Sequence, residues 1–267
     1  MALIYEKKNH VATITLNRPE AHNAIDPQTV VELVDAWQDF SRDPQMRCAI
    51  LTGAGEKSFC AGADLGKLIP LWTGARQPET DADRQVQANP MLAQKALLRD
   101  FTLAKPVIAA INGNAVGGGF EILYSTDIRV AAQGARFGLQ EVRWSIVPAG
   151  GSTVHLTRQI PYARAMEMLL TGELIDAGQA LADGFLNRVV PGERVMETAQ
   201  RYAGIIANNG PLAVAAVKQA VRENSGKDVE AALAREMELA IPVFLSKDAQ
   251  EGPRAFKQKR EPVFTGE

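Results

Sequence analysis

The first clear pattern in the chain is an alternation of side chains with a period of two. Over residues 10–16, one face carries Ala12, Ile14 and Leu16, and the other carries Val11, Thr13 and Thr15. A period of two predicts a β-strand with two distinct faces. Mostly apolar runs follow at 48–52, 106–111 and 128–132. Each of these runs is typical of a short strand that is covered on both sides.

Helical patterns separate these strands. Asp26 and Pro27 supply an N-cap and a first-turn proline, and apolar residues follow at helical spacing from Val30 to Phe40. Beyond Pro191 the strand patterns disappear, and helices are predicted over 193–207, 211–223 and 228–245. Strands that alternate with helices predict an α/β fold. We therefore expect a core over residues 1–190 and a helical C-terminal region over 191–267.

The stretch 66–100 has a different character. It contains Pro70, Gly74, Pro78 and Pro90 and a polar run over 79–84. Proline and glycine interrupt regular elements. We therefore expect a long mobile insertion that is followed by a helix.

Composition and charge restrict the class of protein. The 267 residues carry a formal net charge of −2, which provides no overall field for nucleic acid or an anionic membrane. No apolar run reaches the roughly 18 residues that span a bilayer, and residues 1–10 do not have the pattern of a signal peptide. Cys48 and Cys60 lie in apolar surroundings and are expected to be buried and unpaired. These features favour a cytoplasmic protein.

Two segments offer exposed backbone amides. Gly117, Gly118 and Gly119 follow an apolar strand and precede a helical pattern, and residues 58–64 are small residues after another strand. Amides from two such segments supply the two donors that hold one developing oxyanion. Close packing of a helix and a tight turn are the structural alternatives. The glycines match neither the phosphate-binding loop nor the dinucleotide fingerprint.

Two glutamates accompany these segments. Glu121 follows the glycines directly, and Glu141 precedes a turn-like sequence at 148–151. The sequence does not bring the two side chains together, and each is also compatible with a solvated surface position. His10 and His155 have no partner at metal-ligand spacing, so no metal site is expected.

The order of these motifs resembles the enoyl-CoA hydratase (crotonase) family. The resemblance rests on NRP at 17–19, Asn23-Ala24, FCAGAD at 59–64, NGNAVGGGFE at 112–121, Asp127, FGLQE at 137–141 and PAGG at 148–151, and continues through LTGE at 170–173, 177–187 and FKQK at 256–259. It implies a spiral of repeated β-β-α units, with C-terminal helices that build a homotrimer or a homohexamer. It also implies an acyl-CoA substrate, with coenzyme A as part of the thioester and no tightly bound cofactor.

The resemblance assigns roles to particular residues. The amides of Ala63 and Gly118 are expected to hold the thioester oxygen, while Glu121 acts as base on water and Glu141 protonates C2. Retention of both glutamates favours hydration of a 2-trans-enoyl-CoA. Residues expected to bind coenzyme A are Ala21, His22, Lys57, Ala61 and Leu65, together with Phe256 and Lys259 from a neighbouring subunit.

Other functions remain open at this point. A Δ3,Δ2-enoyl-CoA isomerase would need only Glu141, and a non-catalytic acyl-CoA-binding protein would need neither glutamate. An RNA-binding member would need a basic face with aromatic residues, and the sequence has no obvious one. Leu139 and Ala149 depart from the common family pattern, and Trp72 and Trp144 are candidates for the acyl pocket.

Overall fold

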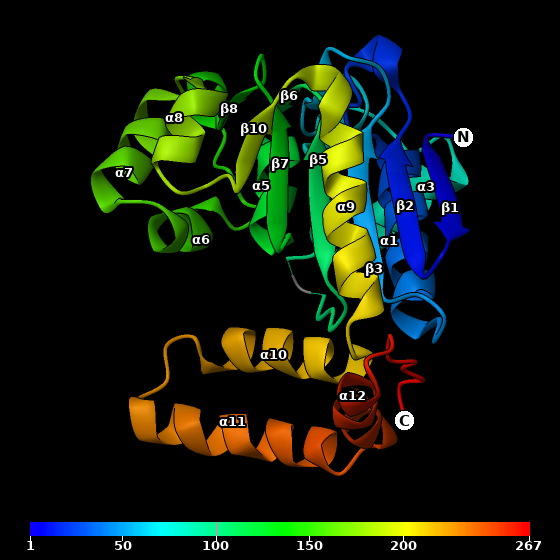
Figure 1. Cartoon of the computed structure of the whole chain (residues 1–267). Coiled ribbons are helices and arrows are strands. Elements are labelled where there is room, and N and C mark those ends of the chain that lie inside the picture. Colours follow the sequence, from blue (N-terminus) through cyan, green and yellow to red (C-terminus); the bar gives the residue numbers. More distant parts are fainter. Residues whose placement is uncertain (100) are drawn as a thin grey trace.

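The computed structural model describes residues 1–99 and 101–267, and its chain winds as a spiral between two sheets (Figure 1). The larger sheet has the order β1 (Leu3–Lys8), β2 (Val11–Leu16), β3 (Cys48–Gly53), β5 (Val107–Ile111), β7 (Ile128–Ala132) and β10 (Arg188–Val190). The smaller sheet has the order β4 (Ser58–Cys60), β6 (Asn114–Val116), β8 (Arg136–Gly138) and β9 (Ile175–Asp176). From β3 to β8, successive strands alternate between the sheets. The expected α/β spiral is confirmed.

The strands of the larger sheet have the predicted faces. β1 pairs antiparallel with β2, and the pairs from β2 through β3, β5 and β7 to β10 are parallel. Ala12, Ile14 and Leu16 of β2 are buried, and every residue of β3 and β5 is buried. The alternating pattern and the mostly apolar runs are both confirmed as strands.

Helix α1 (Pro27–Arg42) begins where the cap predicts. The Asp26 carboxylate accepts a hydrogen bond from the Thr29 amide at 2.9 Å, which satisfies one unpaired donor of the first turn. Trp37 is fully buried on this helix, and its indole N–H donates to the carbonyl of Ala96 at 3.0 Å. This bond joins α1 to the segment that follows β4.

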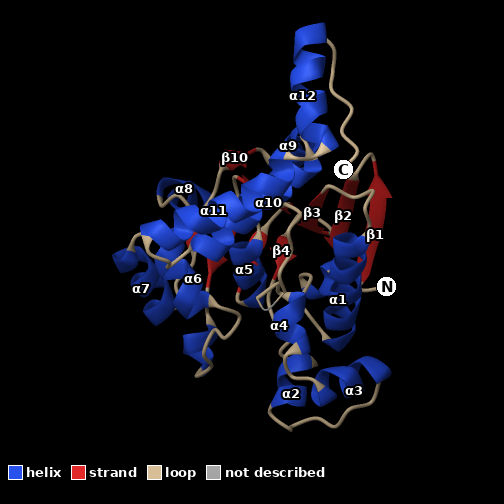
Figure 2. Ribbon diagram, turned by 90° about the horizontal axis from the view of Figure 1, so that it is seen from below, coloured by secondary structure: helices blue, strands red, loops and turns tan. Residues whose placement is uncertain are grey.

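The segment 66–100, expected to be a long insertion followed by a helix, contains three helices rather than one. The segment folds into α2 (Leu68–Trp72), α3 (Asp81–Ala88) and α4 (Leu92–Ala96), with Asp100 outside the described residues. A capping box of Thr80 and Asp83 begins α3, and Arg76 forms an ion pair with Asp83 at 2.7 Å. These helices have five to eight residues, too few for a sequence period to identify. Figure 2 shows α2 and α3 at the end of the molecule opposite to α12 (Lys247–Gln258).

Short helices surround the smaller sheet, and a longer helix covers the larger one. The short elements are α5 (Gly118–Glu121), α6 (Ser152–Gln159), α7 (Tyr162–Thr171) and α8 (Ala177–Ala182), with 3-10 turns at Ile122–Ser125 and Glu141–Trp144. Helix α9 (Val195–Asn208) buries Ala199, Ala203 and Ala207 and packs against β3, β5 and β7.

The C-terminal helices lie to one side of the sheets (Figure 1). Helices α10 (Pro211–Asn224) and α11 (Val229–Phe244) confirm the predicted patterns, whereas α12 was not predicted. The Lys218 ammonium joins α10 to the core, because it donates to the Asp127 carboxylate at 2.7 Å and to the Lys105 carbonyl at 2.9 Å. No helix formed by residues 1–99 or 101–267 has both the length and the apolar character to cross a membrane.

Candidate active site

Three parallel strands of the smaller sheet bring the candidate residues together. β4 pairs with β6 and β6 pairs with β8, all in parallel, so their carboxyl ends meet at one edge of the sheet. Ala63 follows β4, Gly118 follows β6 and Glu141 follows β8. Ligands of parallel α/β sheets commonly bind outside these strand ends. The topology therefore gathers segments that are far apart in the sequence.

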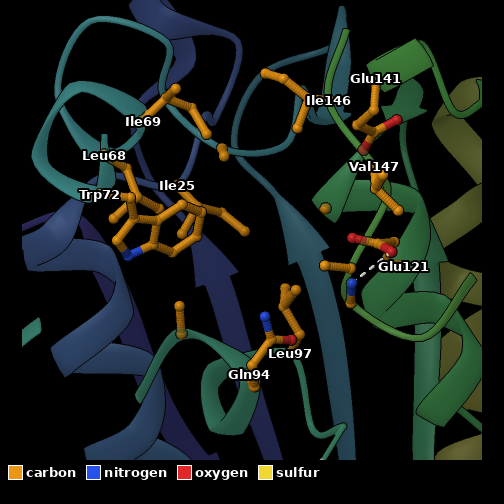
Figure 3. A pocket seen from close by; sticks show the side chains of 15 residues that line it. Ile25, Leu68, Ile69, Trp72, Gln94, Leu97, Glu121, Glu141, Ile146 and Val147 are labelled. Atoms are coloured by element: carbon orange, nitrogen blue, oxygen red, sulfur yellow. Dashed lines mark hydrogen bonds between the residues drawn. The ribbon is translucent and has the colours of Figure 1, made fainter. Parts of the chain in front are cut away.

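A cleft lies at this edge. Its lining is mostly apolar and contains both glutamates, Ala63 and Gly118. Figure 3 shows Glu121 and Glu141 on one side of the cleft and Trp72 on the other. The remaining lining residues are Ile25, Leu68, Ile69, Ala93, Gln94, Leu97, Ile146, Val147, Ala149 and Gly150.

The amides of Ala63 and Gly118 lie close to each other at the cleft. A Cβ placed on Gly118 would be 3.6 Å from the Ala63 nitrogen. The Ile25 amide donates to the Gly62 carbonyl at 2.7 Å and the Asp64 amide donates to the Ile25 carbonyl at 2.9 Å, which fixes the chain on both sides of Ala63. Within the described residues, neither the Ala63 nor the Gly118 N–H donates to a protein acceptor. Both N–H groups are therefore without a protein acceptor in the part of the chain that the structure describes.

Gly117 determines the backbone conformation between β6 and α5. Its φ of 56° and ψ of −130° form a conformation that favours glycine, and its N–H donates to the Gly138 carbonyl at 2.9 Å. A Cβ on Gly117 would lie only 2.9 Å from Oε1 of Glu141. Glycine at this position therefore allows the Glu141 carboxyl to approach the start of α5.

Glu121 is buried and held by two donors. Its Oε1 accepts hydrogen bonds from the Gly150 amide and from the Ser152 hydroxyl, each at 2.7 Å. A Cβ on Gly150 would lie 2.4 Å from Oε2 of Glu121, so the close approach requires glycine. Burial raises the pKa of Glu121, and the hydrogen bonds from Ser152 and Gly150 oppose the increase because they stabilise the ionised form.

Glu141 has a different environment. Its Oε2 is buried and has no hydrogen-bond partner within the described residues. Burial raises the pKa of this carboxyl to about 7, and the negative charge of Glu121 adds to the increase. The carboxyl groups thus differ in their donors. Two hydrogen-bond donors favour the ionised form of Glu121. The pKa of Glu141, raised to about 7, leaves much of this carboxyl protonated near neutral pH.

The first group of residues predicted to bind coenzyme A lies around the turn after β2. The Ala61 amide donates to the His22 carbonyl at 3.0 Å, and the His22 ring contacts the Ser58 hydroxyl at 3.1 Å. Ala21 precedes His22 in the same turn, whereas Leu65 and Lys57 are exposed at either end of the segment that contains Ala61. The structure therefore joins His22 and Ala61, which lie 39 positions apart in sequence (61 − 22).

The second group of residues predicted to bind coenzyme A lies away from the cleft of the same chain. Phe256 is 86% exposed on α12, and Lys259 is the left-handed residue that ends this helix. Neither side chain lines the cleft. This location is compatible with the expectation that they serve a neighbouring subunit.

Sequence reasoning missed the groups that hold Glu121. The PAGG motif contains Gly150, but nothing in the pattern indicated that its amide binds the glutamate, and Ser152 was not selected. The one feature of the sequence that could have identified it is the position of this polar residue directly after Gly150 and Gly151. Of the two tryptophan candidates, Trp72 lines the cleft, whereas Trp144 is 67% exposed and does not.

Comparisons with known proteins agree over the full chain. The model of the family described as Enoyl-CoA hydratase/isomerase matches residues 6–267. The chain is 43% identical to Enoyl-CoA hydratase EchA19 of Mycobacterium tuberculosis, over 98% of this chain and 95% of that protein. It is 40% identical to (E)-benzylidenesuccinyl-CoA hydratase of Thauera aromatica, over 100% of both. The crystal structure of enoyl-CoA hydratase from Bacillus anthracis matches with a TM-score of 0.90 and 36% identity, covering 100% of both chains.

The two alternating sheets and the cleft at the strand ends of the smaller sheet define a protein of the crotonase fold. The chain belongs to the enoyl-CoA hydratase/isomerase family.

Proposed function

We propose that this protein hydrates 2-trans-enoyl-CoA to 3-hydroxyacyl-CoA. The observation that carries this proposal is a pair of carboxyl groups, Glu121 buried and Glu141 half-buried, which have unlike hydrogen-bond environments and line one apolar cleft beside two available amides. Addition of water to an enoyl thioester requires a base, an acid and a group that stabilises the developing oxyanion. The cleft contains residues for all three roles.

The amides of Ala63 and Gly118 bind the thioester oxygen. Attack of water on C3 moves electrons through C2 onto this oxygen, and two fixed donors stabilise the resulting negative charge. Removal of one such donor typically costs about 2.7–4 kcal/mol of transition-state stabilisation. The apolar lining excludes competing water and strengthens these hydrogen bonds.

The two glutamates transfer protons in opposite directions. Glu121 takes a proton from water as the water oxygen bonds to C3, and Glu141 gives a proton to C2, so the sum of the two steps adds one water to the double bond. The two donors on Glu121 favour the ionised base. The pKa of Glu141, raised by burial to about 7, favours the protonated acid near neutral pH.

Coenzyme A follows the surface from the cleft toward the turn of Ala21 and His22. In this proposal the exposed Lys57 and the backbone of Ala61 and Leu65 contact coenzyme A. A neighbouring copy of the chain supplies Phe256 and Lys259 in a homotrimer or homohexamer. The exposed position of Phe256 supports this arrangement, because it leaves the ring free to contact a second molecule.

The acyl group occupies the apolar side of the cleft. Trp72, Leu68 and Ile69 line this side, which supports an apolar acyl chain. Relatives include proteins named (E)-benzylidenesuccinyl-CoA hydratase and carnitinyl-CoA dehydratase, so acyl groups other than simple straight chains occur among similar proteins.

We also propose a reducing, cytoplasmic location. Cys48 and Cys60 are both buried and free. Burial raises the pKa of each thiol to about 12, so neither is a reactive thiolate at neutral pH.

The proposal is tested with crotonyl-CoA and with a 3-enoyl-CoA. We expect wild type to consume the 2-enoyl chromophore. Glu141→Gln should lower this rate by about 10²- to 10⁴-fold and preserve binding of the ligand. Unchanged turnover of Glu141→Gln would contradict the mechanism.

A second variant separates hydration from isomerisation. Glu121→Ala should abolish hydration, because no base remains for water. If the protein were a Δ3,Δ2-enoyl-CoA isomerase that shuttles a proton on Glu141 alone, the variant would still convert the 3-enoyl-CoA at the wild-type rate. Such persistence, with no hydration by wild type, would replace the proposed function with isomerisation.

A further inference from the structure

A short chain of buried hydroxyl groups lies behind Glu121. The Tyr124 hydroxyl donates to the Ser152 oxygen at 3.2 Å, and the Ser152 hydroxyl donates to Oε1 of Glu121 at 2.7 Å. Ser152 has no exposed surface, and Tyr124 and Glu121 are 7% and 5% exposed. Tyr124 and Ser152 are absent from the lining of the cleft, so they act on the carboxylate from within the protein.

We propose that Ser152 is a positioning residue that fixes the Glu121 carboxylate and sets the pH range in which it acts as a base, with Tyr124 supporting it from behind. This inference rests on the proposed function, in which Glu121 accepts a proton from water. It adds two residues to that site that neither touch the substrate nor transfer a proton to it.

The hydrogen-bond directions support this role. A serine hydroxyl has a single proton, and the Tyr124 donor occupies a lone pair of the Ser152 oxygen, so the Ser152 proton is directed to Glu121. The Gly150 amide binds the same oxygen, Oε1. The two donors therefore fix one carboxylate oxygen and leave Oε2 as the basic atom. A donor that itself accepts a hydrogen bond is polarised and becomes a stronger donor.

The Ser152 hydroxyl has no alternative structural partner among the described residues. Ser152 is the first residue of α6, but the N-cap of this helix is Gly151, and no side chain forms an N-capping hydrogen bond. Its hydrogen bonds are those to Glu121 and Tyr124. Replacement of Ser152 by alanine keeps the Cβ and removes only the hydroxyl, so the substitution tests the hydrogen bond with little change in packing.

Other charged and titratable groups surround the pair from several elements. They are Glu141 from the turn after β8, Arg99 from the segment after α4, His155 from α6 and Arg129 from β7 beyond Tyr124. Burial and nearby arginines lower the pKa of His155. Substitution of Ser152 leaves all four groups in place, so a change in the titration of Glu121 reports the lost hydrogen bond.

The test is the pH dependence of crotonyl-CoA hydration. The acidic limb of kcat/KM follows ionisation of the base. A lost donor raises the pKa of Glu121, so Ser152→Ala should move this limb upward by about one pH unit and lower kcat/KM about tenfold on its acidic side, with recovery at higher pH. Tyr124→Phe should move the limb in the same direction by a smaller amount, because its hydrogen bond is long.

The double variant distinguishes a connected chain from two separate structural effects. Tyr124→Phe should add no further shift to Ser152→Ala, because the Tyr124 hydroxyl acts through Ser152. Ser152→Thr retains the hydroxyl and should restore the wild-type limb. Thr52→Val is the matched control, since it removes another buried hydroxyl, which donates to the Ala110 carbonyl at 2.7 Å, and it should not move the limb.

Several results would overturn the inference. They are an unshifted limb in active Ser152→Ala, an equal loss of activity at every pH, or additive effects of the two substitutions. If Ser152→Ala fails to fold, an unshifted limb in Tyr124→Phe overturns it. Titration of Glu121 by carbon-13 NMR separates this inference from the proposed function, because it measures the same shift without turnover. A wild type that hydrates no enoyl-CoA would end the proposed function alone.

Discussion

Two glutamates in one cleft have different hydrogen-bond environments. Glu121 has a backbone and a hydroxyl donor, whereas Oε2 of Glu141 is buried with no partner in the described part of the chain. Burial raises the pKa of both carboxyls. The Ser152 hydroxyl and the Gly150 amide oppose the increase at Glu121, and the backbone N–H of Glu141 opposes it at Glu141. The proposed roles, Glu141 as the acid and Glu121 as the base, rest on this difference in hydrogen bonding and on the pKa of Glu141, which burial raises to about 7.

This difference predicts how stability depends on pH. The pKa of Glu141 is about 7 in the folded protein, against 4.5 for an ordinary glutamate. Between these values the folded state binds more protons than the unfolded state, so the free energy of unfolding falls as pH rises from about 4.5 to 7. Glu141→Gln cannot ionise and should escape this loss. Its stability relative to wild type should increase across this window by on the order of 1–3 kcal/mol, measured by urea unfolding. A difference that is constant with pH would contradict the raised pKa.

Among the secondary-structure elements, the parallel strands β4, β6 and β8 determine where the chemistry lies. Their carboxyl ends adjoin, so the turn after each strand contributes one part of the site. The helices α2 and α4 supply the opposite wall through Trp72 and Gln94. The strand ends thus provide the reacting groups, and the helical segment over 68–96 shapes the space for the acyl group.

This arrangement predicts a change in acyl preference when Trp72 is truncated. Trp72→Ala should widen the cleft and raise kcat/KM for long or branched 2-enoyl-CoA relative to crotonyl-CoA by about tenfold, the size of effect expected for a changed apolar pocket. Trp144→Ala is the matched control, because this residue is 67% exposed and lies outside the lining. A substrate series of increasing chain length measures the effect. Equal changes in both variants would show that Trp72 does not shape the pocket.

At the scale of the whole molecule, one helix of the C-terminal region exposes an apolar face to solvent. Helix α11 contains no buried residue, and its Leu233, Met237, Ile241 and Phe244 are 50–68% exposed. Lys218 and its partners fix α10 to the core, which holds the C-terminal helices in position. Such an apolar face is typical of an interface. This surface supports the proposed homo-oligomer.

The proposed assembly predicts the mass of the protein in solution and predicts that substitutions on α11 reduce that mass to the mass of one chain. Light scattering should give about three or six times the chain mass of 28.9 kDa for wild type. The paired substitutions Leu233→Glu and Phe244→Glu should yield a 28.9 kDa monomer and weaken binding of coenzyme A, because Phe256 and Lys259 of a neighbour would be lost. Leu170→Glu, at an equally exposed position on α7, should preserve the assembly. A monomeric wild type would contradict the prediction.

Local patterns determined the parts of the fold that were predicted correctly. The alternation around Ile14 and the cap at Asp26 depend on neighbours in sequence, and both agree with the structure. β4, β6 and β8 have only three residues each, which is too short for a recognisable period. Pro253 and a polar composition obscured α12.

In the candidate site, too, the sequence identified individual residues but not the contacts that depend on the tertiary fold. The residues at Ala63, Gly118, Glu121 and Glu141 were selected from motifs and a family resemblance, and the structure gathers them at one cleft. Their proximity depends on pairing between strands more than 20 positions apart, which no local pattern contains. The hydrogen bond from Ser152 also depends on the tertiary fold, because its hydroxyl donates to a carboxylate 31 positions earlier in the chain.

The most direct measurement is a crystal structure of the protein with butyryl-CoA, which has no double bond to hydrate. We predict that the thioester oxygen lies about 2.7–3.1 Å from the amide nitrogens of both Ala63 and Gly118. The carboxyls of Glu121 and Glu141 should flank C2 and C3 of the acyl group. A thioester bound away from these amides, or an acyl chain outside the cleft lined by Trp72, would contradict the account.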